Sequence, residues 1–567
     1  MNTKGNLKYF FLTFICIIYL VSSSQATTVK TPAEESNYIK YSQHEEIAGF
    51  LSVVDHMSKE MTVQIIGRTR MTSDYPSKDL FLCIINEEGT DSPHKLNRAK
   101  PTFLLVASQH GNEQSAKEAV LLLIRDLAIG ELRYLLEKVN FLVIPQTNPY
   151  GNWFDQRRNE QDLDLNRDHV KLEAPEVETI HRVFRMWMPE VTMDVHEKGD
   201  DYYRVSIGCV SNASIHASLQ EFARKNILVE VENSLKMQGI TFHEYLVTQL
   251  MGIDSSAGVS YRPEDMGKRE MMKRYSTTDL NDGRNSLGIY ETLSFIQEGA
   301  SRHDIETLKE RTTWQYFGIR YCAESVARHG EEVISLVHRL REELLERAKA
   351  YSEDDKVHLR MIYARDENKP ELVIKKFERT ETPIRGILKI DKKAGDVIIR
   401  ADLAPYPYPS KYLVVEEVVK NWFPHVEPAI SVSRPLAYII PAKHHDIVET
   451  MLQHGFKFDI FTKDTYLECE AYKITDILPA KYDYLPPQKI QVDKKILKAI
   501  VKRGDFYVSC AQTGANLIPC LLEPQSQYGF IRYWKYRLVP EMGDVFPFLR
   551  VVKEKDLPLL PYKNWKK

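Results

Sequence analysis

The strongest constraint on the fold is a regular alternation of apolar runs and amphipathic segments. Residues 101–108 read Pro-Thr-Phe-Leu-Leu-Val-Ala-Ser, an almost uninterrupted apolar run that is typical of a strand buried on both faces. A segment with helical spacing follows it, from Ser115 to Ile129. Further strands are expected at 61–66, 80–85, 139–145, 191–195 and 286–295, and helices at 44–54, 175–187 and 303–350. The alternation predicts an α/β fold with a mixed, mainly parallel sheet flanked by helices.

The pattern changes after about residue 351. Short strand-like runs separated by proline and glycine replace the alternation, and residues 405–409, Pro-Tyr-Pro-Tyr-Pro, are typical of a rigid connector. At 567 residues the chain is also long for a single hydrophobic core. We therefore expect a C-terminal β-rich or α+β module of unknown role. The expected divisions are a signal peptide at 1–26, a linker at 27–40, the α/β domain at 41–350 and the module at 351–567.

The N-terminal residues have the pattern of a secretory signal. Lys4 and Lys8 precede an apolar stretch from Tyr9 to Val21, and Ser24-Gln-Ala26 occupies the position where a signal is cleaved. The stretch is short for a membrane-spanning helix, and no other segment is apolar enough to span. We predict a secreted or periplasmic protein with no stable membrane span after cleavage. The alternative is an uncleaved N-terminal anchor.

Charge and cysteine content exclude several classes of protein. The net charge is −3, so there is no basic excess of the kind that binds nucleic acid. Of the seven cysteines, Cys16 lies in the expected signal, and the others are too sparse for a disulfide scaffold. Cys510 and Cys520 are the candidates for one disulfide. No Cys-x-x-Cys occurs, which argues against a thiolate zinc site.

Histidines and a carboxylate follow the expected strand ends. His110 and Glu113 stand in Ser-Gln-His-Gly-Asn-Glu after the buried strand at 101–108, and His196 ends Met-Asp-Val-His after the strand at 191–195. Two imidazoles and one carboxylate are the protein ligands of an open catalytic zinc site. Ligands of parallel α/β sheets collect at the carboxyl ends of the strands. The positions of these residues therefore favour a zinc site at that edge.

Each element of this set is weak alone. The His-x-x-Glu spacing recurs at His303 and at His329, but both lie in polar helical stretches and are best interpreted as solvated helix faces. Only His110 follows a buried strand. A lone histidine such as His196 is more often structural than a ligand, and its place at a strand end in the same half of the chain favours ligation.

A cluster of polar residues lies between the two histidine motifs. Asp164 is a candidate acceptor for orienting a ligating imidazole. Asn166 and Arg167 follow directly, and an arginine beside an asparagine suits a substrate carboxylate. Arg157 and Arg158 lie upstream. The alternative interpretation is a solvated loop in which these arginines pair with the acidic residues between 160 and 168.

Taken in order, these motifs resemble a known family. His-x-x-Glu, then Arg-x-Asn-x-x-x-x-Asp-Leu-Asn-Arg, then a distant His and a late strand with Glu, is similar to the zinc metallocarboxypeptidases related to pancreatic carboxypeptidase A, over roughly residues 40–345. Residues 511–524 are similar to a C-terminal segment of some secreted bacterial members, which suggests a remote bacterial-type branch. The chain departs from the family in having Asn-Arg-Asp-His where Asn-Arg-Asn-Phe is common, and in a shorter segment from Glu113 to His196.

The resemblance implies a role for each matching residue. His110, Glu113 and His196 match the zinc ligands, and Asp164 matches the acid that orients the first histidine. Asn166 and Arg167 match the pair that binds the terminal carboxylate of the substrate. Arg157 matches the arginine that polarises the scissile carbonyl, with Arg158 as the alternative.

Two further assignments from the resemblance are less well defined. Glu291, in Gly-Ile-Tyr-Glu-Thr-Leu-Ser-Phe, is the best match to the catalytic glutamate, and Glu298 is its rival. Tyr275 is the candidate for the mobile tyrosine that caps the substrate, with Tyr261 as the alternative. The neighbours of neither tyrosine match the family closely, and the specificity pocket stays unassigned.

The sequence thus predicts a secreted, Zn²⁺-dependent carboxypeptidase that acts on peptides or peptide-like substrates with a free C-terminal carboxylate. One alternative is a related zinc deacylase or cell-wall peptide amidase, which needs the same carboxylate contacts. Another is a binding protein with an inactive peptidase fold. The preferred side chain at the cleaved end, the role of the C-terminal module and the oligomeric state stay open.

Overall fold

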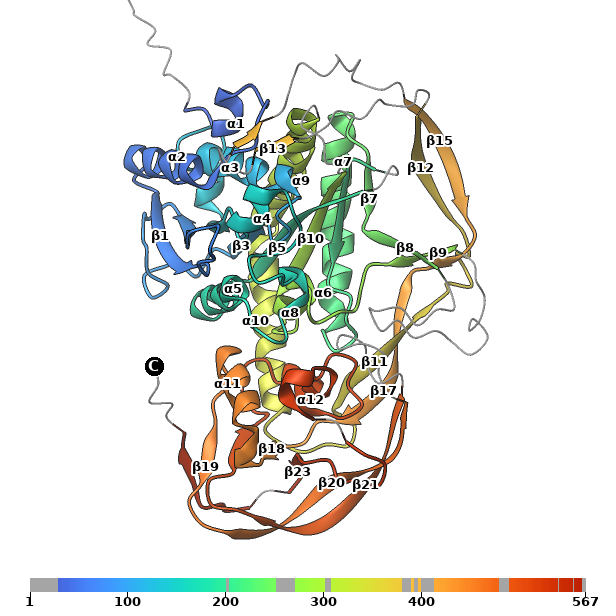
Figure 1. The fold of residues 1–567 in the computed structure, drawn as a ribbon. Helices are drawn as coiled ribbons and strands as arrows, with labels where there is room; N and C mark the ends of the chain where they lie inside the picture. The colour runs from blue at the N-terminus through green and yellow to red at the C-terminus, as the bar shows by residue number, and fades with distance from the viewer. Residues whose placement is uncertain are drawn as a thin grey trace, which may run out of the picture.

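An eight-stranded sheet forms the centre of the N-terminal half in the computed structural model of the protein (Figure 1). Its strands, in order across the sheet, are β1 (Met61–Arg68), β2 (Asp79–Ile85), β4 (Asn140–Ile144), β3 (Thr102–Ala107), β5 (Val191–Lys198), β10 (Leu293–Ala300), β6 (Val205–Cys209) and β7 (Phe242–Glu244). Strands β4, β3, β5 and β10 are mutually parallel. The pairs β1–β2, β2–β4 and β10–β6 are antiparallel, and β6 and β7 are parallel to each other. This confirms the predicted α/β class with a mainly parallel sheet.

The structure describes residues 29–199, 203–250, 271–300, 307–379, 389–391, 396–398, 412–478, 489–538, 540–553 and 555–562. The expected signal at 1–26, the candidate Tyr261 and most of the strands expected near 384–401 lie outside them. No described helix is long and apolar enough to cross a membrane.

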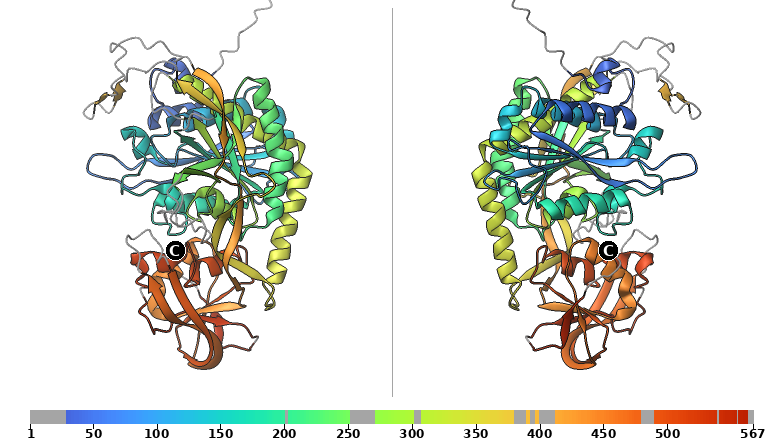
Figure 2. Two further views of the ribbon diagram at one scale, coloured as in Figure 1. Left: turned by 90° about the vertical axis from the view of Figure 1, so that its right-hand side faces the viewer. Right: turned by 90° about the vertical axis from the view of Figure 1, so that its left-hand side faces the viewer.

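Helices lie on both sides of this sheet (Figure 2). They include α2 (His44–Met57), α3 (Gln114–Ala128), α5 (Pro175–Trp187), α7 (Val229–Met237), α9 (Leu308–Arg328) and α10 (Gly330–Arg347). Local sequence sets the bounds of α5. Pro175 stands in its first turn, where a missing N–H costs no hydrogen bond, and Met188 ends it in the left-handed region with φ of 45°. The helical stretch expected at 303–350 is divided, since α9 ends at Arg328 and α10 begins at Gly330.

Two expected segments differ from the structure. The strand expected at 286–295 begins only at Leu293, because Asp282 caps a short helix, α8 (Gly283–Gly288), by accepting a hydrogen bond from the backbone N–H of Asn285. The segment expected to be a linker contains α1 (Pro32–Glu35), whose Glu34 carboxylate pairs with Arg125 of α3 at 2.6 Å. This part of the chain is therefore anchored to the α/β domain.

The C-terminal region is β-rich, as predicted. Strands β11 (Lys356–Ala364) and β17 (His425–Ser433) form one antiparallel ribbon, and β12 (Leu372–Arg379) and β15 (Tyr412–Val419) form another. A seven-stranded antiparallel sheet follows, in the order β21 (Lys489–Val501), β20 (Thr465–Leu478), β23 (Leu549–Val551), β18 (Ala437–Ile440), β22 (Phe506–Ser509), β19 (Asp459–Phe461) and β24 (Leu559–Pro561). It lies beyond the lower end of α10 in Figure 1.

The two halves of the chain share a small sheet. Strand β16 (Trp422–Phe423) pairs in parallel with β9 (Met271–Tyr275), which in turn pairs with β8 (Leu246–Leu250). Side chains bridge the same boundary, since the Asn516 amide donates to the carbonyl of Ser214 at 2.7 Å and the Asn281 amide donates to the Tyr533 hydroxyl at 2.6 Å. One hydrophobic cluster also contains residues from both halves, such as Phe184 and Phe456.

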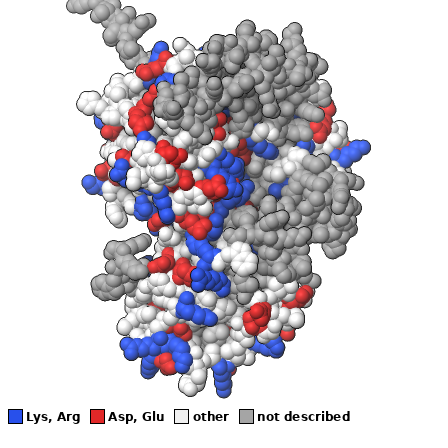
Figure 3. Space-filling view, in the orientation of Figure 1, with Lys and Arg blue, Asp and Glu red and all other residues white. Residues whose placement is uncertain are grey.

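The cysteine expectation was wrong. Cys510 and Cys520 are both buried free thiols, as are Cys83, Cys209, Cys322 and Cys469. Acidic and basic side chains are interspersed over the described part of the face drawn in Figure 3, in keeping with the small net charge of −3.

Candidate metal centre

His110, Glu113 and His196 converge at the carboxyl ends of β3 and β5. The Nδ1 atoms of both histidines face the Glu113 carboxylate, His110 at 2.7 Å from Oε1 and His196 at 2.7 Å from Oε2. One donor atom from each of the three residues lies within 4.8 Å of the others. All three side chains are buried. Residues from two strand ends thus form one compact cluster, in the place that the sequence predicted.

Each imidazole is oriented through its other nitrogen by its own carboxylate. His110 Nε2 lies 3.1 Å from Asp164 Oδ1, and His196 Nε2 lies 2.7 Å from Asp194 Oδ2. A carboxylate at Nε2 favours the tautomer that carries its proton there and leaves the Nδ1 lone pair free for a metal. Asp164 is the acid expected at the first histidine. Asp194 was missed, although it stands two residues before His196 on the same face of a strand.

Close contact between the three side chains shifts the pKa values of His196 and Glu113 in opposite directions. Burial lowers the pKa of His196, but Asp194 and Glu113 outweigh it and bring this pKa well above its ordinary value. Burial raises the pKa of Glu113, yet the two histidines hold that pKa far below its usual range. The backbone N–H of Glu197 also donates to Glu113 Oε2 at 2.9 Å. Glu113 therefore stays ionised and fixed between the imidazoles.

Of the two candidate arginines, Arg157 is the one at the cluster. Its Nη1 lies 3.1 Å from His110 Nδ1 and 3.7 Å from Glu113 Oε1, while its Nε donates to Asp164 at 2.8 Å. Arg158 instead donates to the carbonyl of Asp162 in an exposed loop. Both arginines pair with acidic residues of the loop, Arg157 with Asp164 and Arg158 with Asp162, and only Arg157 also reaches the cluster.

Asn166 and Arg167 lie beside the cluster in different settings. The Asn166 amide is buried, with Nδ2 3.0 Å from His196 Nε2 and Oδ1 accepting from the backbone N–H of Gly283 at 2.7 Å. The Arg167 side chain is 36% exposed and approaches Asp279 only at 3.9 Å. Arg167 Nη1 also donates to the backbone carbonyl of Asn166, and the Arg167 side chain is the more exposed of the pair.

The structure places Glu291 away from the cluster, which corrects its assignment as the catalytic glutamate. Its carboxylate accepts from the backbone N–H of His216 at 3.1 Å and from the Asn516 amide at 3.3 Å. Glu291 precedes β10, and the length of that strand separates it from the carboxyl end by about 20 Å. It lines a cavity of about 400 Å³ where the two halves of the chain meet, and burial raises its pKa to about 7.

Glu298 stands at the end of β10 that faces the cluster. It pairs in register with His196 of β5, and register partners in neighbouring strands direct their side chains to the same face of a sheet. The side chain is 7% exposed. Burial raises its pKa to about 7, against the lowering effect of His196. The rival named from the sequence is therefore the glutamate that the fold brings to the two histidines.

Tyr275 does not lie at the cluster either. It is buried on β9, where its hydroxyl donates to the carbonyl of Cys209 at 3.2 Å, and it lines the same cavity as Glu291. Another tyrosine, Tyr245, lies nearer to the cluster. Burial and the Glu298 carboxylate raise the pKa of Tyr245, and Lys198 Nζ lies 5.0 Å from the centre of its ring.

The donor set fits zinc. Two neutral imidazole nitrogens and one carboxylate are the ligands of catalytic zinc sites that keep an open position, and no other group of three His, Cys, Asp or Glu side chains among the described residues could hold a metal ion. Both imidazoles also have the hydrogen-bonded carboxylate that such ligands require.

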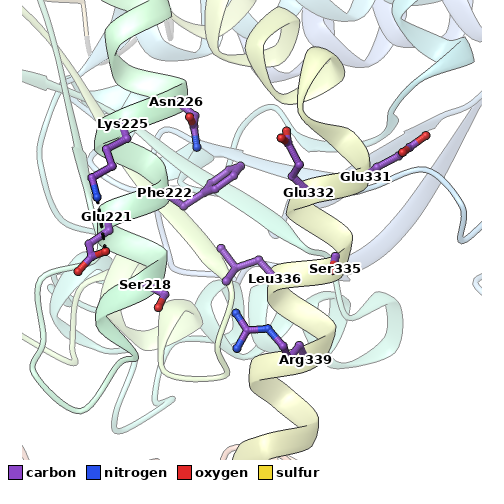
Figure 4. A pocket seen from close by; sticks show the side chains of 10 residues that line it. All are labelled: Ser218, Glu221, Phe222, Lys225, Asn226, Glu331, Glu332, Ser335, Leu336 and Arg339. Carbon is purple, nitrogen blue, oxygen red and sulfur yellow. Dashed lines mark ion pairs between the residues drawn. The ribbon is translucent and has the colours of Figure 1, made fainter.

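Other cavities of the described residues lack this chemistry. A groove of about 530 Å³ runs between α10 and the helical segment formed by α6 (Ala217–Phe222) and η3 (Ala223–Leu228) (Figure 4). Phe222 and Leu336 face each other across it, and Lys225 pairs with Glu221 at its rim at 3.8 Å. The groove brings no group of metal-ligating side chains together.

The fold and the site define a metal-dependent hydrolase of the α/β class. Residues 54–184, which include His110 and Glu113, match the family model described as zinc carboxypeptidase. Over these residues the chain is similar to the zinc carboxypeptidase family, in which the metal cofactor is zinc, and the cluster of His110, Glu113 and His196 could hold a metal ion.

Several proteins are similar to this chain. Carboxypeptidase 2 of Trichophyton rubrum is 24% identical over 462 residues, covering 78% of this chain and 75% of the relative. Carboxypeptidase 2 of Trichophyton tonsurans is 23% identical over 480 residues, covering 81% and 77%. Among solved structures, a metallo-carboxypeptidase from Pseudomonas aeruginosa is 18% identical with a TM-score of 0.37, covering 52% of this chain and 71% of that one.

Proposed function

We propose that the protein is an exported carboxypeptidase that hydrolyses the C-terminal bond of peptides, with zinc held by His110, Glu113 and His196. The observation that carries the proposal is the convergence of these three donors, with each imidazole oriented by its own carboxylate. Zinc, when bound there, acts as a Lewis acid and lowers the pKa of bound water from about 16 to about 7.

Glu298 is the general base in this proposal. Its place in register with His196 puts its carboxylate on the face of the sheet that holds the ligands. From there it would take a proton from the attacking water and return it to the leaving amine. Arg157, whose Nη1 touches the ligand cluster, would stabilise the charge that develops on the carbonyl oxygen.

Arg167 would select substrates with a free C-terminal carboxylate. Its guanidinium is partly exposed beside the cluster, and a guanidinium binds a carboxylate through two parallel hydrogen bonds. Asn166 would support it indirectly, because the Asn166 side-chain oxygen accepts a hydrogen bond from the backbone N–H of Gly283, which fixes the segment that carries Arg167.

Arg167→Ala is expected to lower kcat/KM for a free-acid peptide about 10- to 100-fold, mainly through KM, which corresponds to the loss of a charge-assisted contact. Turnover of the matched C-terminal amide should change little. The measurement is amino-acid release from the paired peptides. Arg158→Ala is the control for Arg167→Ala. It also removes one guanidinium from this segment, but the Arg158 side chain donates to the carbonyl of Asp162 in the exposed loop instead of lying beside the cluster. Equal losses on acid and amide would contradict the proposed contact.

The same assay separates the alternatives. Chelator-sensitive release from free acids supports the carboxypeptidase. Zinc binding without peptide hydrolysis, but with release of acyl groups from N-acyl amino acids or of peptides from cell-wall fragments, would favour the deacylase or amidase. Zinc binding with no hydrolysis of any of these would favour an inactive binding protein. Export is tested separately, by sequencing the N-terminus of the mature protein for cleavage after Ala26.

A further inference from the structure

A chain of buried hydrogen bonds leads away from His196. Asp194 Oδ2, which lies 2.7 Å from His196 Nε2, also accepts from Gln109 Nε2 at 2.8 Å. The side-chain oxygen of Gln109, Oε1, lies 2.9 Å from His169 Nε2. At its far end, His169 Nδ1 lies 3.0 Å from His181 Nε2. Each of these five side chains is at most 4% exposed.

The charge on Asp194 sets the direction of every bond in this chain. A carboxylate only accepts, so Gln109 must present its NH₂ group to Asp194 and its oxygen to His169. His169 must then carry its proton on Nε2. Its Nδ1 is left as an acceptor for the Nε2 proton of His181. Burial keeps both rings neutral by lowering the pKa of His169 to about 3 and that of His181 well below its ordinary value.

Gly283 closes the space around Asp194. A Cβ atom at Gly283 would lie 2.8 Å from Asp194 Oδ2 and 2.9 Å from Gln109 Nε2, so no larger residue fits without displacing the pair. The second carboxylate oxygen, Asp194 Oδ1, is buried with no hydrogen-bond partner among the described residues. Asp194 therefore depends on Gln109 for the hydrogen bond that fixes it beside His196.

We propose that His169, supported by His181, is a positioning residue that orients Gln109 so that Asp194 accepts the Nε2 proton of His196. The Nδ1 lone pair of His196 is then left free to bind a metal. The inference rests on the proposed zinc site. His169 is where the sequence has Asn-Arg-Asp-His in place of the common Asn-Arg-Asn-Phe. A phenylalanine fills a similar volume but cannot donate to Gln109.

The test is the zinc dissociation constant of the full-length protein, measured by competition with a chelator. His169→Phe is expected to weaken zinc binding about 10-fold, the lower end of the effect for residues that orient metal ligands. His169→Gln, whose Nε2 can replace the imidazole donor, should restore binding to within about threefold of wild type. Gln109→Met should match His169→Phe, and the double variant should be no weaker than either single one, because one break already uncouples the chain.

His44→Phe is the control. His44 is also buried and hydrogen-bonded, to the carbonyl of Asp79 at 2.8 Å, but lies outside the chain, so its loss should leave zinc affinity unchanged. Unchanged affinity in His169→Phe, or additive losses in the double variant, would overturn the inference while leaving the zinc site intact. If His169→Phe does not fold, Gln109→Met and His169→Gln decide the question. Failure of the wild type to bind zinc would instead overturn the proposed function.

Discussion

Glu298→Gln is expected to lower kcat on a free-acid peptide by about 100- to 10,000-fold while leaving the zinc content at wild-type level. Glutamine matches the size of the side chain but cannot take a proton from water. The side chain is no member of the ligand cluster, so zinc binding should persist. Steady-state kinetics and metal analysis on the same preparation provide both readouts.

Glu291→Gln is the matched control for this change. The substitution is chemically identical, but Glu291 precedes the amino end of the same strand, where its carboxylate bonds to His216 and Asn516 instead of facing the cluster. Glutamine keeps only one of the two acceptor oxygens, so one of these hydrogen bonds is lost, but the loss occurs away from the metal cluster. We expect kcat within about threefold of wild type, since no reacting group is touched. Loss of turnover in Glu291→Gln with full activity in Glu298→Gln would reinstate the original assignment of the base.

His196→Ala is expected to abolish both zinc binding and turnover. Removing one of three protein ligands leaves His110 and Glu113, which is too few for a catalytic zinc site. Because a ligand stabilises the folded state that binds it, zinc at 100 times its dissociation constant should stabilise the wild type by about 2.7 kcal/mol. The variant should show no such effect. Thermal unfolding with added zinc and with chelator is the measurement.

His329→Ala provides the control for that variant. His329 has the same His-x-x-Glu spacing, with its Nδ1 2.6 Å from Glu332, but its other nitrogen faces Glu230, and it belongs to no described group that could hold a metal ion. Its zinc content, activity and response to chelator should equal those of the wild type. A wild-type zinc content in His196→Ala would contradict the proposed ligand set.

Local patterns predicted the elements that carry the metal centre. The apolar runs before His110 and His196 form adjacent parallel strands, so two residues far apart in sequence meet at one edge of the sheet. Alternation of strands and helices is enough to predict this, because parallel strands place their carboxyl ends together. Asp194 could have been found in the same way, since alternate residues of a strand share a face.

The position of Glu291 shows where local patterns are insufficient to locate a residue relative to the cluster. Residues 286–295 have strand-like composition. However, the helix α8, capped by Asp282, includes the first of these residues, so β10 begins only at Leu293. Applied to the actual strand, the carboxyl-edge rule selects Glu298 rather than Glu291. Family spacing alone could not locate the strand start, which depends on a capping hydrogen bond.

Tertiary contacts decided the remaining differences. Tyr275 is taken up by the sheet that β9 forms with β8 and β16, a pairing between distant parts of the chain that periodicity cannot predict. The anchoring of α1 likewise depends on Arg125, about ninety residues away along the chain. The Asn166 side chain follows the same rule, because its partner Gly283 comes from another segment.

The sheet that β9 shares with β16 bears on what the C-terminal region is. Each half supplies strands, buried amides and apolar side chains to the other, so neither closes its own core alone. If the chain were cut near residue 351, the fragments would relate to one another as subunits of an obligate heterodimer rather than as separable modules. Exchange of the C-terminal region between relatives would then require the catalytic half to be remodelled with it.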